Sequence, residues 1–274
     1  GAFPDTFRQG VIEQRLFPDA LLELRISAAT VADCDGLALP DSASAFRFAS
    51  DGVAAMGQSM GGMYTNMFGA VEPRVEAVVP TGAGGYWSYF ILETNLIPGV
   101  GGLLARLIGT PHLSFLHPVL HMLQTAWEPA EPFVYVPRLA TAPLDGHPAR
   151  SIYQPAGQGD SYFPTSTYDA ITLAYGHVQA GASVWELTQS WLAYRGLDGL
   201  ASYPVRQNMT SRDGRPYTAA MAQFAGDGVH DPHEIFQYDD AVKHQYGCFL
   251  ASFFAAGAAT IPAPAPVDTV CTGL

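Results

Sequence analysis

The chain has 274 residues, of which 48% are hydrophobic and 14% are charged, so it can build the core of one large α/β domain or two small ones. This composition excludes intrinsic disorder, a coiled coil and a collagen-like repeat. The 13 Lys and Arg residues against 25 Asp and Glu residues give a formal net charge of −12, which argues against a basic surface for nucleic acids or anionic membranes. No uncharged apolar stretch reaches the roughly 18 residues of a membrane-spanning helix.

The first quarter of the chain predicts a helix, a strand and a second helix. In residues 7–26 the apolar side chains recur at helical spacing, and Pro18 is expected to kink that helix. Residues 33–50 are rich in turn formers, and residues 52–56 form a short apolar run typical of a buried strand. A helix-compatible stretch then runs to about Ala70.

Further along, strands and helices are expected to alternate. Strands are predicted at residues 73–79, 148–154 and 217–224, and helices at residues 167–180, 183–194 and 239–256. Such alternation predicts an α/β fold, with a mostly parallel sheet and helices on both faces. Residues 84–146 interrupt the alternation and are rich in Leu, Pro and aromatic residues. We interpret them as a cap inserted into a core made of residues 1–83 and 147–274.

The strongest chemical signal is a Gly-x-Ser-x-Gly motif at Gly57, Ser59 and Gly61. It lies between a predicted strand and a predicted helix, where a tight turn would leave the Ser59 hydroxyl exposed at the end of the strand. The flanking glycines are expected to relieve crowding in that turn. The backbone N–H of Met60, at the start of the helix, is positioned to stabilise an oxyanion. The motif therefore predicts a serine nucleophile.

At these residues the chain resembles the α/β-hydrolase family, and in particular its bacterial lipase and esterase branch. The matching segments are residues 56–62 around Ser59, residues 157–160 (Gly-Gln-Gly-Asp) and residues 227–233 (Asp-Gly-Val-His-Asp-Pro-His). The resemblance extends from about residue 7 to residue 255. It implies an α/β-hydrolase fold and a catalytic triad in the order nucleophile, acid, histidine, each on a loop that follows a strand.

The acid of such a triad is predicted to be Asp160, which follows the third strand through a Gly-rich loop. A triad acid orients the histidine and stabilises its imidazolium form. Asp145 precedes that strand and Asp169 lies within the next predicted helix, so both fit the role less well.

Two histidines compete for the role of general base, because His230 and His233 lie on one loop after residues 217–224. The spacing from His233 to Asp239, and the apolar pair that follows His233, resemble the family pattern, so His233 is favoured and His230 remains the alternative. A metal site made of His230, Asp231 and His233 is disfavoured, because no further ligand has suitable spacing and Ser59 would be left unexplained. We expect neither a metal nor an organic cofactor.

Two further groups of residues invite a specific expectation. Tyr86, Trp87, Tyr89 and Phe90, just after the second strand, either line an acyl pocket or anchor the cap on the sheet. Among the cysteines, we expect a disulfide between Cys34 and Cys271, which would tie down a tail that alternating prolines keep extended, and a buried thiol at Cys248. Such a disulfide favours a secreted or periplasmic location.

The resemblance also implies four strands and a helix ahead of residues 7–26. A strand that carries a nucleophile is normally central and paired along both edges. The strands predicted downstream supply neighbours on one side only. We therefore expect a separate segment or chain to complete the sheet beside residues 52–56 and to supply the second oxyanion donor.

Together these features predict a serine hydrolase that cleaves carboxylic esters of small or lipid-like substrates through Ser59, Asp160 and His233, with Met60 contributing to the oxyanion hole. A peptidase or an acyltransferase of the same fold is the alternative, and a non-catalytic binding module is a third possibility. Turnover of nitrophenyl esters against aminoacyl-nitroanilides would separate these classes.

Overall fold

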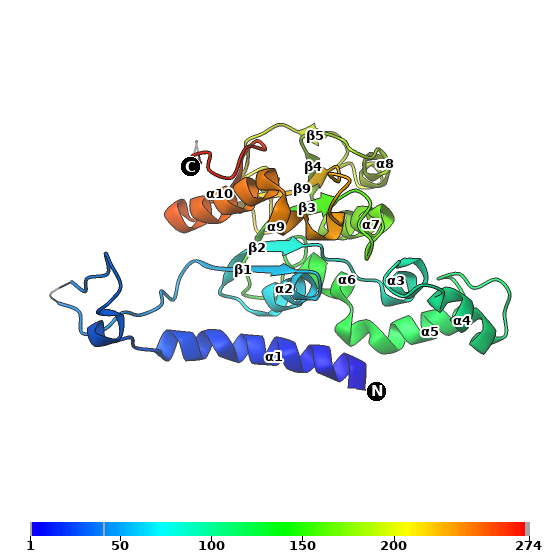
Figure 1. Ribbon diagram of the computed structural model, residues 1–274, viewed down its shortest axis with the longest axis horizontal. Helices are drawn as coiled ribbons and strands as arrows, with labels where there is room; N and C mark the ends of the chain where they lie inside the picture. Colours follow the sequence, from blue (N-terminus) through cyan, green and yellow to red (C-terminus); the bar gives the residue numbers. More distant parts are fainter. Residues whose placement is uncertain (1, 41, 272–274) are drawn as a thin grey trace.

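The computed structural model describes residues 2–40 and 42–271 and is organised around one six-stranded sheet (Figure 1). All neighbouring strands in this sheet run parallel. The spatial order is β1 (Val53–Gln58), β2 (Val75–Thr81), β3 (Ser151–Gly157), β9 (Ala219–Phe224), β4 (Val178–Ala180) and β5 (Leu200–Ala201). The predicted α/β class with a mostly parallel sheet is confirmed.

Helices cover both faces of the sheet. Successive residues of a strand point to opposite faces, so each buried strand contributes side chains to two separate cores. Ala77 and Val79 of β2 face α9 (Ile235–Tyr238) and α10 (Asp240–Ala256). Val78, between them, faces the opposite core, which contains Phe68 of α2 (Met60–Val71) and residues of α7 (Thr165–Tyr175). The central strands β2, β3 and β9 are almost fully buried, as expected for parallel strands covered on both faces.

The N-terminal helix α1 (Ala2–Glu23) runs along the outside of α2, beneath it in the view of Figure 1. The ring of Phe7 stacks on that of Tyr64 with centroids 5.1 Å apart. Towards the other end of α1, Asp19 forms an ion pair of 2.7 Å with Arg74, in the turn between α2 and β2. The helix is continuous through Pro18.

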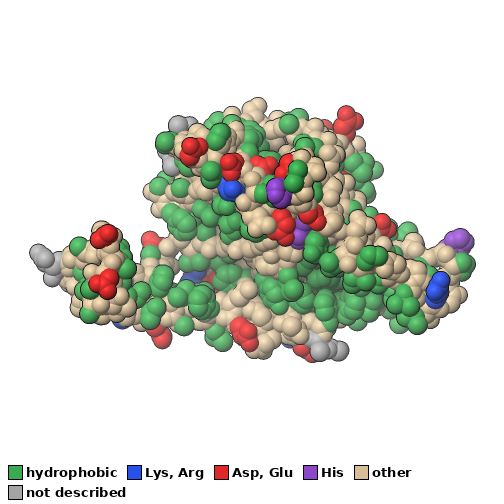
Figure 2. Space-filling model, in the orientation of Figure 1, with side chains coloured by type: hydrophobic (Ala, Val, Ile, Leu, Met, Phe, Trp, Pro, Cys, Tyr) green, Lys and Arg blue, Asp and Glu red, His purple; other side chains and the backbone are tan. Residues whose placement is uncertain are grey.

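The long connection between β2 and β3 is helical and extends sideways from the sheet in Figure 1. It contains α3 (Trp87–Glu93), α4 (Val100–Ile108), α5 (Pro118–Trp127), the short 3-10 helix η2 (Glu128–Ala130), α6 (Pro132–Tyr135) and a second 3-10 helix η3 (Val136–Arg138). Exposed apolar side chains such as Leu107 and Met122 gather on this part of the surface (Figure 2). Val136 and Leu139, in contrast, belong to the core beneath the sheet, so the end of this connection is part of the α/β body. None of the described helices is both long and apolar enough to cross a membrane.

The remaining short elements surround the second half of the sheet. They are η1 (Ala28–Val31), α8 (Leu187–Ala193), η4 (Pro232–Glu234), the antiparallel pair β6 (Val205–Arg206) and β10 (Thr260–Ile261), and the antiparallel pair β7 (Met209–Thr210) and β8 (Pro216–Tyr217).

The strand β4 is absent from the sequence predictions, which assign residues 167–180 to one helix. That helix ends at Tyr175, because Gly176 adopts the left-handed conformation (φ 73°) that stops a helix, and residues 178–180 then enter the sheet beside β9. β5 was also not predicted. It is only two residues long and therefore carries no periodic signal.

The predicted disulfide between Cys34 and Cys271 is wrong. Cys271 pairs with Cys248 of α10, which is itself not the free buried thiol that was expected, and Cys34 is exposed and free. The reason is the path of the tail: Thr260 N–H donates to Ser252 Oγ at 2.8 Å, so the chain turns back along α10 and passes Cys248. The tail is tethered covalently as expected, but to the last helix.

Strand β1 lies at one end of the sheet and, among the described residues, pairs with β2 alone. Its side chains are only partly buried, unlike those of β2 and β3. A cavity of about 520 Å³ borders this edge, lined by apolar side chains that include Phe17, Leu21, Phe48 and Phe254. The strand that precedes Ser59 therefore has one hydrogen-bonding edge without a partner strand within residues 2–40 and 42–271.

Candidate active site

Ser59 occupies the turn between β1 and α2 with a strained backbone, φ 57° and ψ −120°. Its N–H donates to the carbonyl oxygen of Thr81 at the end of β2, at 2.9 Å. A Cβ atom on Gly57 would lie 2.3 Å from the Gly61 carbonyl oxygen, and one on Gly62 would lie 2.7 Å from the Ala83 Cβ. A Cβ atom on Gly61 would meet nothing within 4 Å, so the expected crowding at Gly61 is absent and occurs at Gly62 instead.

Met60 is the first residue of α2, and its side chain is exposed. The N–H groups in the first turn of a helix have no carbonyl partner within that helix, and they lie at the positive end of the helix dipole. The Met60 N–H therefore has no carbonyl partner within α2.

Asp160 and His233 are brought together from the ends of two neighbouring strands, β3 and β9. His233 Nδ1 lies 2.9 Å from Asp160 Oδ2, and both side chains are buried. The other carboxylate oxygen, Oδ1, accepts the N–H groups of Tyr162 and Phe163 at 2.7 and 2.9 Å. These bonds fix the carboxylate so that it meets the Nδ1 side of the ring.

Two tyrosines complete the surroundings of this pair. The Tyr168 hydroxyl donates to Asp160 Oδ2, the same oxygen that faces His233. Burial, together with the negative charge of Asp160, raises the pKa of Tyr168 well above its usual value, so the hydroxyl stays protonated and remains a donor. The Tyr162 ring stacks on the His233 ring with centroids 4.0 Å apart, which restricts rotation of the imidazole.

The side chain of Gln58 connects the serine turn to the histidine loop. Its Nε2 donates to the carbonyl oxygen of His233 at 2.6 Å, and its Oε1 accepts the hydroxyl of Thr81 at 2.7 Å. Gly82 permits this contact, because a Cβ at that position would lie 2.5 Å from Gln58 Nε2. Gln58, the residue directly before Ser59, thus connects the serine turn to the backbone of His233.

His230, the alternative base, lies apart from Asp160 and pairs instead with Asp227, its Nδ1 being 2.7 Å from Oδ2. The side chain is 56% exposed and stacks on Tyr238 with centroids 4.6 Å apart. Hydrogen bonds from the His230 ring and from the backbone N–H groups of His230 and Val229 lower the pKa of Asp227 to about 2. His230 therefore belongs to a surface pair.

The three residues of the alternative metal hypothesis have separate partners. Asp231 accepts bonds from the backbone N–H and hydroxyl of Ser161, and it also accepts the His233 N–H at 2.9 Å. His233 faces Asp160 and His230 faces Asp227. Residues 2–40 and 42–271 contain no group of three or more His, Cys, Asp or Glu side chains arranged to hold a metal ion.

Gln58, Tyr168 and Tyr162 are the site residues that sequence reasoning missed. Gln58 occupies a variable position inside the motif itself, so its type alone carries no signal. Tyr168 lies eight residues after Asp160, and a hydrogen-bonding side chain in the first turn of the following helix is the clue that could have indicated it.

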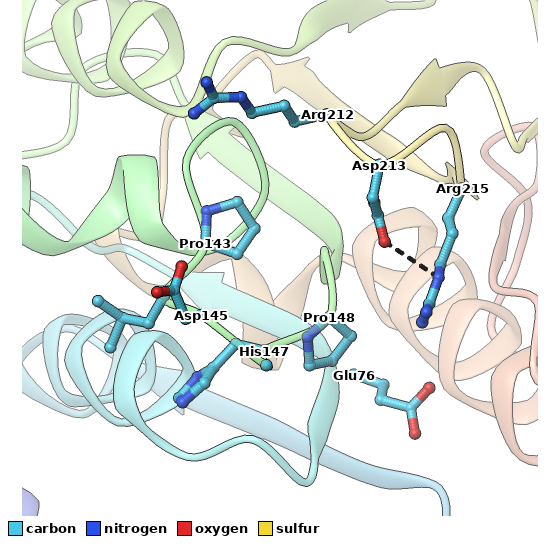
Figure 3. A pocket seen from close by; sticks show the side chains of 10 residues that line it. Glu76, Pro143, Asp145, His147, Pro148, Arg212, Asp213 and Arg215 are labelled. Atoms are coloured by element: carbon cyan, nitrogen blue, oxygen red, sulfur yellow. Dashed lines mark ion pairs between the residues drawn. The ribbon is translucent and has the colours of Figure 1, made fainter.

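A second concave feature lies at the opposite end of the sheet, where the strands begin (Figure 3). This cavity, of about 660 Å³, is lined by side chains of both charges, including Glu76, His147, Arg212 and Arg215. Asp213 forms an ion pair of 3.1 Å with Arg215 there. None of the predicted site residues contributes to it, so the candidate chemistry belongs to the carboxyl end of the strands.

The sequence matches no known family profile and no curated protein. Solved structures do show similarity. The puromycin-hydrolyzing peptidase of Mycobacterium tuberculosis has a TM-score of 0.34 and 16% identity over 64% of this chain, and acetyl xylan esterase 1 from a Thermoanaerobacterium species has 0.34 and 15% over 65%. The 2,6-dihydroxy-pseudo-oxynicotine hydrolase has 0.40 and 17% over 88%. The chain spans 18%, 41% and 50% of the lengths of these three proteins.

Proposed function

We propose that the protein is a serine hydrolase that cleaves carboxylic esters, with Ser59 as nucleophile, His233 as general base and Asp160 as the acid that orients the base. The observation that carries this proposal is the buried Asp160–His233 pair, which Gln58 links to a strained serine turn. Strain and a buried Asp–His contact at one end of a parallel sheet are typical of a nucleophilic site.

In the proposed mechanism, Ser59 Oγ attacks the ester carbonyl carbon and its proton passes to His233 Nε2. The carbonyl oxygen gains negative charge, which the Met60 N–H stabilises together with a second donor. The tetrahedral intermediate collapses, and the imidazolium gives its proton to the departing alcohol. Water then gives a proton to His233 and attacks the acyl-enzyme carbonyl carbon. When this second intermediate collapses, the imidazolium returns the proton to Ser59 Oγ and the carboxylic acid is released.

A fluorophosphonate probe tests the nucleophile directly. It should label the wild-type chain at Ser59 and leave Ser59→Ala unlabelled, and this variant should lose ester hydrolysis by a factor on the order of 10³ with unchanged melting behaviour. Labelling at a different serine would refute the assignment. Hydrolysis of aminoacyl-nitroanilides in preference to nitrophenyl acetate and butyrate would favour a peptidase, and turnover of neither would favour a binding module.

We also propose that a polypeptide segment outside these 274 residues adds a strand to the free edge of β1 and supplies the second oxyanion donor. The unpaired edge and the apolar cavity beside it support this idea, because exposed backbone groups flanked by apolar side chains favour strand addition. In the 274-residue chain made alone, the β1 amide hydrogens that do not bond to β2 should exchange rapidly. An active monomer of 29.3 kDa with protected β1 amides would refute the proposal.

The helices α3–α5 of the predicted cap are proposed to border the substrate entrance, and the Cys248–Cys271 disulfide supports an oxidising location, secreted or periplasmic. Alkylation of unreduced protein from its native source tests the location. It should modify Cys34 alone, and modification of all three cysteines would contradict it.

A further inference from the structure

An aromatic cavity of about 340 Å³ lies between the β2–β3 connection and the helices that follow Asp160. Its walls include Tyr86, Tyr89, Phe115, Phe133, Ala170 and Trp191, and we call it the aromatic pocket. Tyr86 directly precedes α3, and the other side chains come from α3, α6, α7, α8 and the loop before α5. A volume at the lower end of the range for small-molecule sites suits a single ring or a short branched group.

The rings of the aromatic pocket are held against one another in edge-on arrangements. The centroid of Tyr86 lies 6.0 Å from that of Phe115 and 6.1 Å from that of Phe133, and Tyr89 lies 5.4 Å from Phe115. The Tyr89 hydroxyl and Ser166 Oγ bond to each other at 2.8 Å, so these polar groups already satisfy one another. The pocket therefore favours an aromatic or apolar occupant.

The backbone at the mouth of this pocket is fixed at a conformational cost. Tyr86 has a left-handed backbone (φ 60°), which is rare for a bulky residue. The buried carboxylate of Glu131 accepts the N–H groups of Tyr86 and Trp87 at 2.7 and 3.0 Å. A Cβ on Gly85 would come within 2.6 Å of Glu131 Oε1. The Glu131 bonds hold Tyr86 in this conformation, so this wall of the pocket is fixed in position.

Not all aromatic residues after β2 belong to this wall. Trp87 packs against Phe7 of α1, with centroids 5.4 Å apart, and its indole N–H donates to the Ala130 carbonyl oxygen at 2.8 Å. Phe90 packs against Phe163 with centroids 5.1 Å apart. Trp87 and Phe90 therefore anchor the insertion, whereas Tyr86 and Tyr89 line a cavity.

Two of the segments that line the pocket follow residues beside the candidate triad. Tyr86 lies five residues after Thr81, whose carbonyl oxygen accepts the Ser59 N–H. Ser166 lies six residues after Asp160, at the start of α7. We propose that the aromatic pocket binds a compact aromatic or branched apolar group and that, on the basis of the proposed function, this group is the acyl or the alcohol part of the ester.

Binding is tested first without any catalysis, using benzyl alcohol as the probe and titration followed by ligand-observed NMR. Wild type and Ser59→Ala should bind it equally. Ala170→Leu, which fills the pocket, should weaken binding at least tenfold, and Ala193→Leu, an exposed position on α8, should bind within twofold of wild type. Phe115→Ala removes a wall from a loop position and should also weaken binding, which provides a second variant if Ala170→Leu fails to fold.

Kinetics then identify which part of the substrate enters the pocket. Phenyl acetate carries its ring in the alcohol part and methyl phenylacetate carries it in the acyl part. Ala170→Leu should raise KM at least fivefold for one of these esters, whereas Ala193→Leu should leave KM within twofold of wild type for both.

The outcomes separate the two proposals. Absent binding, or equal binding by wild type and Ala170→Leu, would overturn the aromatic pocket. If Ala170→Leu weakens binding but no Ser59-dependent ester turnover is found, the aromatic pocket is supported as a binding site and only the proposed function is refuted. An unchanged KM for both aromatic esters, with turnover intact, would overturn the pocket's role in substrate binding.

Discussion

Two histidines on the loop after β9 each face an aspartate, His233 facing Asp160 from the end of β3 and His230 facing Asp227 of the same loop, and the two pairs differ mainly in their surroundings. Asp160 and His233 are 2.9 Å apart and buried, and the carboxylate accepts two backbone N–H groups and a tyrosine hydroxyl as well. Asp227 and His230 are 2.7 Å apart, and Asp227 also accepts two backbone N–H groups, but this pair is exposed. The separation of an acid and a histidine thus says little about function, whereas burial and the bonds from Tyr168 and Gln58 distinguish the pair of Asp160 and His233.

The largest expected difference between the two pairs is in ester hydrolysis. His233→Ala should reduce kcat/KM by a factor on the order of 10³, because it removes the proposed base, while His230→Ala should change it less than threefold. Steady-state assays with nitrophenyl acetate give both values. If His230→Ala proves the more damaging change, the base is His230 and the buried pair is structural.

The link through Gln58 sharpens the comparison, since only the buried pair is tied to the serine turn. Gln58→Ala should lower kcat about tenfold with little change in KM, because the His233 backbone loses its bond to Gln58 Nε2. Gln237→Ala, at an exposed position of α9 where the side chain bonds to Glu234, is the matched control. Equal effects of the two substitutions would argue against a positioning role for Gln58.

The Tyr168 hydroxyl is expected to have a smaller effect. Tyr168→Phe removes one donor from Asp160 and should lower kcat about three- to fivefold and stability by about 1–2 kcal/mol. Tyr175→Phe on the same helix removes a buried bond to Asn66 and should have a similar cost in stability but full activity. Thermal melts and initial rates on both variants separate the two effects, and a loss of activity in Tyr175→Phe would attribute the result to general destabilisation.

The surface pair offers a prediction with no expected effect on activity. Because the His230 ring is the largest cause of the low pKa of Asp227, about 2, its removal should raise that pKa towards the ordinary value near 3.9. The carboxyl chemical shift of Asp227, followed by NMR from pH 2 to 6 in wild type and His230→Ala, measures this change. An unchanged midpoint would mean that the backbone N–H groups alone hold the charge.

Much of the scaffold was predictable because it depends on local patterns. The four longer strands and α10 each have a continuous apolar or helical pattern, and the structure contains them within three residues of the predicted starts. The surroundings that distinguish His233 from His230 are formed by Tyr168, Tyr162 and Gln58. These residues are far from the histidines in the sequence, so local patterns do not reveal the contacts. The disulfide failed for the same reason, since the path of the tail beside α10 is tertiary information.

The contact between Gln58 and His233, which spans 175 residues of sequence, has a consequence for biosynthesis. A ribosome that has made β1, α2 and even Asp160 has not yet made the loop that holds the imidazole. Since chains are extended at about 5–20 residues per second, the serine turn would wait roughly 10–35 seconds after its own synthesis before its partner is made. Incomplete products of translation would consequently carry the serine without its base. The proposed activity would appear only when nearly the whole chain has been released and folded.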